Sequence, residues 1–100
     1  MVKWTLPAKI DLREIREYIA KDSTFYAHKV SEEIVEASET LSTLPRRARI
    51  VPETDEDTVR EIFLYTYRIL YEIIDQDVYI LAIIHGRRNI SSADIPREVT

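Results

Sequence analysis

The residues best suited to chemistry in this sequence stand together at positions 85–88, in the order His-Gly-Arg-Arg. They close the most apolar stretch of the chain, residues 78–84, and Gly86 is the only glycine. Glycine adopts positive φ freely, so its single use predicts a sharp backbone break at the end of a buried strand. One imidazole and two guanidiniums at such a break suit the binding of phosphate or carboxylate. We therefore expect a working surface here.

A second group of cations, Arg46, Arg47 and Arg49, lies before an acidic segment at residues 53–57. The net charge of the chain is −4, which argues against a general nucleic-acid binder with a broad basic surface. Two arginine clusters on an acidic chain fit a focused contact with an anion. We expect the Arg46–Arg49 cluster to bind an anion or an acidic protein partner.

Composition restricts the other classes of site. The 100 residues are predicted to form one domain, residues 1–100, and the chain has no cysteine, which excludes disulfides and thiolate metal sites. No His, Asp or Glu spacing suggests a metal site, and no glycine-rich loop suggests a nucleotide cofactor. No apolar run approaches the ~20 residues of a membrane-spanning helix, and no signal peptide is evident. We expect no cofactor, no metal, no membrane contact and a cytoplasmic location.

Two amphipathic helices must position the N-terminal half. After a β-prone segment at residues 2–5, the period changes to that of a helix with Pro7 in its first turn. A second helix is predicted over Thr24–Ser42, capped from Asp22-Ser23 and ended by Pro45. The short break between them implies an antiparallel helical hairpin. The predicted buried faces are Ala8, Leu12, Ile15 and Ile19 in the first helix, and Tyr26, Val30, Ile34, Ala37, Leu41 and Leu44 in the second.

The C-terminal half reads as strands joined by short turns. A short strand is predicted at 49–51, followed by strands at 59–65, 67–74 and 78–85, which gives an antiparallel meander. The fold class is α+β, in the order β-α-α-β-β-β, with the helical hairpin packed on one face of a small antiparallel sheet. The other face is predicted to be partly open, and residues 91–100 to be an irregular polar tail. Along one strand the buried face is expected to hold Tyr67, Ile69, Tyr71 and Ile73.

Several short motifs in this order resemble a known family. They are Trp4, Asp11-Leu12-x-x-Ile15-x-x-Tyr18-Ile19-Ala20, Ala27, Leu44-Pro45, Arg49-Ile50-Val51-Pro52-Glu53, Arg60-Glu61, Tyr67-Arg68-Ile69-Leu70-Tyr71 and Ile84-His85-Gly86-Arg87-Arg88. Together they resemble the RelE/ParE superfamily of type II toxin–antitoxin toxins, which includes ParE-like plasmid stabilisation proteins. The resemblance implies a growth-inhibiting toxin with a cognate antitoxin from an adjacent gene, together forming a hetero-oligomer. Some members cleave mRNA in the ribosomal A site, whereas others poison DNA gyrase.

A ribonuclease would need a base, an acid and a cation that stabilises the phosphorane. The resemblance implies Arg68 as this cation and His85 as a catalytic histidine, and Glu53, Glu61 or His85 could act as the base. Two departures count against this mechanism. The chain has no lysine beyond Lys29, where RelE-like nucleases carry them, and no tyrosine follows the last predicted strand.

The His-Gly-Arg-Arg ending looks more like that of ParE members. We therefore expect poisoning of DNA gyrase by protein contact, with Arg87, Arg88, Gly86 and Arg60 as the target-binding residues. The first alternative is a ribosome-dependent mRNA endoribonuclease, and the second is a non-toxic module that only binds the antitoxin. Plainer structural roles exist as well, because Arg68 could pair with Glu61 or Glu72 across strands and Arg60 and Glu61 could be structural.

Overall fold

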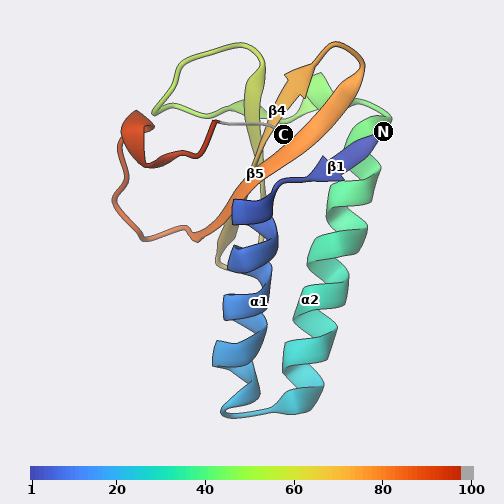
Figure 1. Ribbon diagram of the computed structural model, residues 1–100, viewed down its shortest axis with the longest axis vertical. Helices are drawn as coiled ribbons and strands as arrows, with labels where there is room; N and C mark the ends of the chain where they lie inside the picture. Colours follow the sequence, from blue (N-terminus) through green and yellow to red (C-terminus); the bar gives the residue numbers. More distant parts are fainter. Residues whose placement is uncertain (98–100) are drawn as a thin grey trace.

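The computed structural model describes residues 1–97 and consists of a helical hairpin on one face of a five-stranded sheet (Figure 1). The spatial order of the strands is β1-β5-β4-β3-β2. The elements are β1 (Val2–Trp4), α1 (Leu6–Ala20), α2 (Thr24–Glu39), β2 (Arg49–Ile50), β3 (Val59–Leu64), β4 (Tyr67–Ile74) and β5 (Asp77–His85), with 3₁₀ turns at Thr40–Ser42, Pro45–Arg47 and Ser92–Asp94. The α+β class and the order of elements are as predicted.

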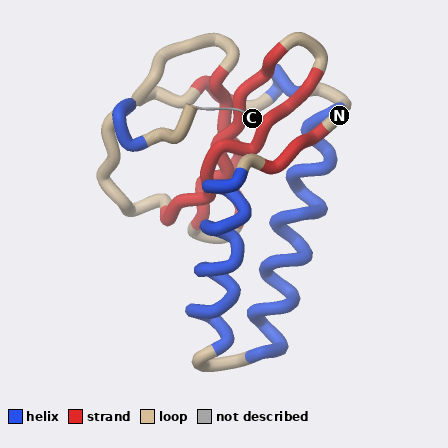
Figure 2. Tube along the Cα trace, viewed as in Figure 1, coloured by secondary structure: helices blue, strands red, loops and turns tan. Residues whose placement is uncertain are grey.

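The sheet is mixed rather than wholly antiparallel. Strands β2 to β5 pair antiparallel, whereas β1 pairs parallel to β5, with Val2 opposite Val78 and Trp4 opposite Ile80. Parallel neighbours need a long connection, and the helical hairpin begins that connection directly after β1. In Figure 2 the two helices run side by side, and the far end of the hairpin extends beyond the sheet. Within the described residues no helix is long and apolar enough to cross a membrane.

Side-chain caps fix where the helices begin. The hydroxyl of Thr5 accepts from the backbone N–H of Ala8 at 3.4 Å and donates to the carbonyl of Ile80 at 2.7 Å, so it joins α1 to β5. The hydroxyl of Ser23 accepts from the N–H of Tyr26 at 3.1 Å, as the capping prediction required. Helix α2 ends at Glu39 and tightens into a 3₁₀ turn over the last predicted helical residues.

The buried face of α2 differs in part from the predicted one. Ile34 and Leu41 are buried as expected, but Tyr26 and Leu44 are 58% and 54% exposed. Two serines, Ser31 and Ser38, take part in the buried face together with Ala27. Each serine hydroxyl donates to a carbonyl of its own helix three residues earlier, at 3.0 Å and 2.7 Å, so each is buried with its polar group satisfied. A pattern that counts only apolar residues misses this face.

The face of the sheet against the helices, called here the helix-covered face, holds the main core. The predicted inward residues of β4 are confirmed: Ile69, Tyr71 and Ile73 are buried there and Tyr67 packs at the margin. They meet Ile34 and Leu41 from the helical layer and its 3₁₀ extension. This core fixes the hairpin on the sheet.

The opposite side, called here the far face, is covered rather than partly open. Its apolar cluster is Val51, Val59, Leu70, Leu81, Ala82, Ile84 and Ile95. Ile95 comes from the predicted polar tail and is 4% exposed, held beside a 3₁₀ turn with a capping box. The tail therefore packs on the sheet as far as residue 97, and its last three positions, 98–100, lie outside the described residues. A register shift at Leu70/Tyr71 also places both Leu81 and Ala82 on the far face.

Candidate functional site

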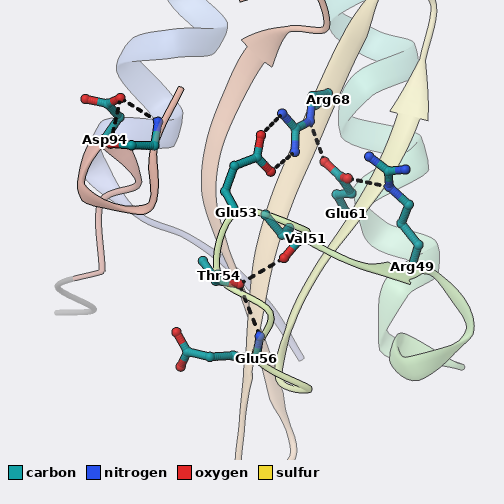
Figure 3. Close-up of polar contacts among 9 residues, drawn as sticks. Arg49, Val51, Glu53, Thr54, Glu56, Glu61, Arg68 and Asp94 are labelled. Atoms are coloured by element: carbon teal, nitrogen blue, oxygen red, sulfur yellow. Dashed lines mark hydrogen bonds and ion pairs between the residues drawn. The ribbon is translucent and has the colours of Figure 1, made fainter. Parts of the chain in front are cut away.

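Four charged residues form a closed group on the far face, called here the arginine–carboxylate cluster: Arg49, Glu53, Glu61 and Arg68. Glu53 binds Arg68 through both carboxylate oxygens, at 2.7 Å and 2.9 Å. The Nε of Arg68 donates to Glu61 at 2.5 Å, and the other oxygen of Glu61 accepts from the Nε of Arg49 at 2.6 Å. Figure 3 shows Glu61 between the two arginines and Glu53 reaching Arg68 from a loop.

Strand register explains part of this cluster. Arg49 of β2 lies directly opposite Glu61 of β3, and Glu61 lies opposite Leu70 of β4. Arg68 is two positions before Leu70, so its side chain leaves the sheet on the same side as that of Glu61. Glu53 comes instead from the loop between β2 and β3. Strand pairing therefore fixes three members, and the loop supplies the fourth.

Burial makes these ion pairs tight. The side chains of Glu61 and Arg68 are 0% and 6% exposed, whereas that of Glu53 is 23% exposed. Hydrogen bonds from Arg68 lower the pKa of Glu53 to about 2, and those same bonds raise the pKa of Arg68. A carboxylate with so low a pKa is a weak proton acceptor at neutral pH. The geometry brings Arg68, Glu53 and Glu61 together, and it pairs them with one another.

His85 lies on the opposite side of the sheet. It pairs across β4 and β5 with Tyr67, and Arg68 pairs with Ile84. Neighbouring residues on a strand point to opposite faces, so His85 is on the helix-covered face with Tyr67, where their rings stand edge to face at 6.0 Å between centroids. The four residues proposed for a ribonuclease are thus divided between the two faces.

A hollow of about 650 Å³ opens beside His85, between α1 and the ends of β4 and β5. The Asp11 carboxylate in it accepts the N–H of Ile83 at 2.9 Å, and burial raises the pKa of Asp11. Sequence reasoning used Asp11 only as part of a family motif and missed this bond. The polar residues in its lining are Asp11, Glu14, Tyr18, Thr66, Tyr67, His85 and Arg88.

Gly86 serves a close approach of two backbones, not a positive φ. Its N–H donates to the carbonyl of Thr66 at 2.6 Å, and a Cβ on Gly86 would lie 3.1 Å from that oxygen. In residues 1–97 the positive φ angles belong to Asp55, Tyr65 and Asp75. The expectation of a strained glycine at this break is therefore wrong, because here the space beside the turn at Thr66, rather than φ, requires a glycine.

The two arginines after Gly86 are both exposed. Neither Arg87 nor Arg88 makes an ion pair within the described part of the chain. The N–H of Arg87 donates to Nδ1 of His85 at 3.2 Å, which holds the turn after β5. Two guanidiniums are thus free to meet an external anion at the end of β5.

The other predicted binding arginines are mostly engaged inside the molecule. Arg60 donates to the carbonyls of Arg46, Ala48 and Asp57 at 2.8 Å each and to the Asp57 carboxylate at 2.7 Å, with its side chain 12% exposed. Arg46 also pairs with Asp57. Arg47 is exposed and makes no ion pair within residues 1–97. Of the 46–49 group, it is the residue available to a partner.

Sequence reasoning missed one further ion-pair group on the far face. Arg97 binds Glu56 at 2.8 Å and 3.1 Å, and Glu72 at 3.0 Å and 3.1 Å. It ties the C-terminal segment to the 53–57 loop and to β4. The pairing of Arg49 with Glu61 was within reach, since opposite charges face each other across paired strands, but it required the register of β2 on β3.

Comparison with known proteins decides the family. Residues 2–90 match the model of the family described as "ParE toxin of type II toxin-antitoxin system, parDE". The chain belongs to the ParE toxin family. Its resemblance to the RelE/ParE superfamily is thus confirmed, and the chain is a type II toxin.

Two individual proteins support membership of the ParE family. The chain is 33% identical over 88 residues to "Toxin RelE2" of Caulobacter vibrioides, covering 87% of this chain and 96% of that protein. A solved structure, "Chromosomal ParDE TA system from P. aeruginosa", superimposes with a TM-score of 0.71 at 24% identity, over 84% of this chain and 92% of that one. The second match shows that this ParE-family chain shares the fold of that system.

Proposed function

We propose that this ParE-family toxin stops growth by binding DNA gyrase and stabilising its cleaved DNA complex, without bond-breaking chemistry of its own. The observation that carries the proposal is the contrast between arginines. Arg68, which a ribonuclease would need as a free cation, is buried and bound by two carboxylates. Arg87 and Arg88 are exposed, and within residues 1–97 no acidic side chain pairs with them. A contact surface needs only the latter.

Purified protein, gyrase and supercoiled plasmid test this proposal directly. We expect cleaved plasmid to accumulate with the wild type and to be largely lost with the R87A/R88A variant. The matched control is R13A/R16A, which removes two exposed arginines from α1 and should leave the cleaved product unchanged. Equal loss in both variants, or no cleaved plasmid with wild type, would contradict the gyrase proposal.

Mapping of new mRNA 5′ ends after brief induction tests the ribonuclease alternative. The name of the Caulobacter relative, Toxin RelE2, is the reason to include it. New ends in register with codons, abolished by His85→Ala, would favour mRNA cleavage and contradict the gyrase proposal. Growth that is unaffected by induction would favour the third possibility, a module that only binds its antitoxin.

We also propose an antitoxin partner, in a hetero-oligomer with this chain. The matching P. aeruginosa structure is that of a ParDE TA system, and the fold is shared. Arg47 lies between two hollows of about 510 and 480 Å³ that also share the exposed Leu44, which suits an acidic segment with apolar side chains. Co-expression with the product of the adjacent gene should restore growth and yield a stable complex, and Arg47→Glu should weaken that complex more than Arg13→Glu does.

A further inference from the structure

The guanidinium of Arg68 is bound in the way that arginine binds phosphate. Its two terminal nitrogens each donate to one oxygen of Glu53, at 2.9 Å and 2.7 Å (Figure 3). This paired geometry fits two oxygens of a carboxylate or two oxygens of a phosphate equally well. The position of the Glu53 carboxylate is therefore one that a phosphate could occupy.

Three members of the arginine–carboxylate cluster are fixed by strands, and their charges do not cancel. Arg49, Glu61 and Arg68 belong to β2, β3 and β4 and carry a net charge of +1 together. Arg68 and Glu61 are buried, and an unbalanced buried charge is costly. This trio requires one further anion beside Arg68.

Glu53 supplies that anion from a part of the chain that can release it. It is in the loop between β2 and β3, where the N–H groups of Thr54 and Asp55 both donate to the Val51 carbonyl at 3.1 Å and 3.0 Å. These bonds hold the backbone of the turn, and Val51 is fully buried. The Glu53 side chain is 23% exposed, so it can leave Arg68 by rotation about its own bonds without breaking strand pairing.

We propose that Arg68, with Arg49 beside it, forms a phosphate-binding site that the carboxylate of Glu53 occupies in the resting chain. Glu53 is then an internal competitor of an external phosphate. Arg49 is 56% exposed, and its single hydrogen bond within residues 1–97 is the one that its Nε makes with Glu61, so its terminal nitrogens add a second cation at the mouth of the site. The inference does not depend on the identity of the toxin's target.

Removing the competitor tests the proposal. We would compare thermal unfolding of the wild type, Glu53→Ala and Glu53→Gln in sodium phosphate and in sodium chloride of equal ionic strength. The Tm of the wild type should be the same in both salts. The Tm of Glu53→Ala should rise in phosphate, on the order of 5 °C when phosphate exceeds its Kd about tenfold. Glu53→Gln keeps the side-chain volume without the charge, so it serves the same test if the alanine variant does not fold.

A matched control removes a similar pair from the same loop. Glu56 binds Arg97 through both oxygens, but that pair is much more exposed, with side chains 50% and 35% exposed. Glu56→Ala should show no phosphate-specific rise in Tm. An equal rise in Glu56→Ala would overturn the proposal, as would a folded Glu53 variant that does not respond to phosphate or a wild type that responds as strongly as the variants.

Nuclear magnetic resonance of the arginine side chains places the ligand. In Glu53→Ala the Nε–H signals of Arg68 and Arg49 should shift on titration with inorganic phosphate, and shifts confined to other arginines would overturn the assignment. A parallel titration with hexauridylate distinguishes the sources of phosphate. Shifts with inorganic phosphate alone identify a site for free phosphate, and shifts with both identify a site open to a nucleic-acid phosphodiester.

Discussion

The two faces of β4 are built from the same strand but are stabilised in different ways. On the helix-covered face, Ile69, Tyr71 and Ile73 pack into one apolar core with the helices. On the far face, Leu70 contributes to a smaller apolar cluster, and Arg68 and Glu72 hold ion pairs to a loop and to the C-terminal segment. Apolar packing positions the rigid helical layer, whereas charge pairing positions irregular segments that have little apolar surface of their own.

The largest difference between the faces should appear when adjacent buried residues are truncated. Ile69 and Leu70 are both fully buried and point to opposite faces. We expect Ile69→Ala to lower the free energy of unfolding by about 4 kcal/mol and Leu70→Ala by about 2–3 kcal/mol, because the main core contains more surrounding side chains that lose contacts. Urea unfolding measures both. Equal costs would show that the two apolar clusters act as one core.

The charged part of the far face is tested at Arg68. Arg68→Met should lower the free energy of unfolding by about 3 kcal/mol, since it leaves the buried Glu61 paired with Arg49 alone. Adding Glu61→Gln to that variant should recover part of the loss, because the buried charge is then removed. Arg97→Met, which breaks exposed pairs on the same face, should cost at most about 1 kcal/mol. If Arg97→Met costs as much as Arg68→Met, burial does not explain the effect.

Gly86 tests how closely the hairpin turn and the end of β5 approach. Gly86→Ala places a Cβ 3.1 Å from the Thr66 carbonyl, and both groups belong to the backbone. We expect a loss of about 1–2 kcal/mol in the free energy of unfolding, as for other small-to-large changes in close-packed sites. Arg87→Ala, at the next and exposed position, should change it by less than about 0.5 kcal/mol. A neutral Gly86→Ala would mean that the turn at Thr66 moves without cost.

The pH dependence of stability separates the two faces most finely. The pKa of Glu53 is lowered to about 2, so its contribution to stability is fully present above its ordinary value and is lost as pH falls toward 2. Over that range one such proton contributes a slope of at most ~1.4 kcal/mol per pH unit. Urea unfolding at a series of pH values should show this slope in the wild type and a reduced slope in Glu53→Gln. Ile69→Ala should lower the whole curve without changing the slope, and a change there would blur the distinction between the faces.

Much of the scaffold followed from local pattern. The 3.6-residue period before and after Ser23, the cap at that serine and the alternation along residues 67–73 predicted the hairpin, its break and the helix-covered face. These features depend on neighbours in the sequence, so local rules describe them well. The exceptions are local rules with incomplete input, as at Ser31 and Ser38, where a hydroxyl bonded to its own helix behaves as a small buried group.

The sequence by itself determined the helical hairpin, the strands, the family and the residue types available for binding. The tertiary structure alone decided which of those residues meet. His85 is opposite Tyr67 and Arg68 is opposite Ile84 because of the register of β4 on β5, and this separates them onto two faces. Glu53 reaches Arg68 because the loop after β2 crosses the far face. Register and loop path depend on contacts between residues far apart in the chain, and no spacing within a short segment contains that information.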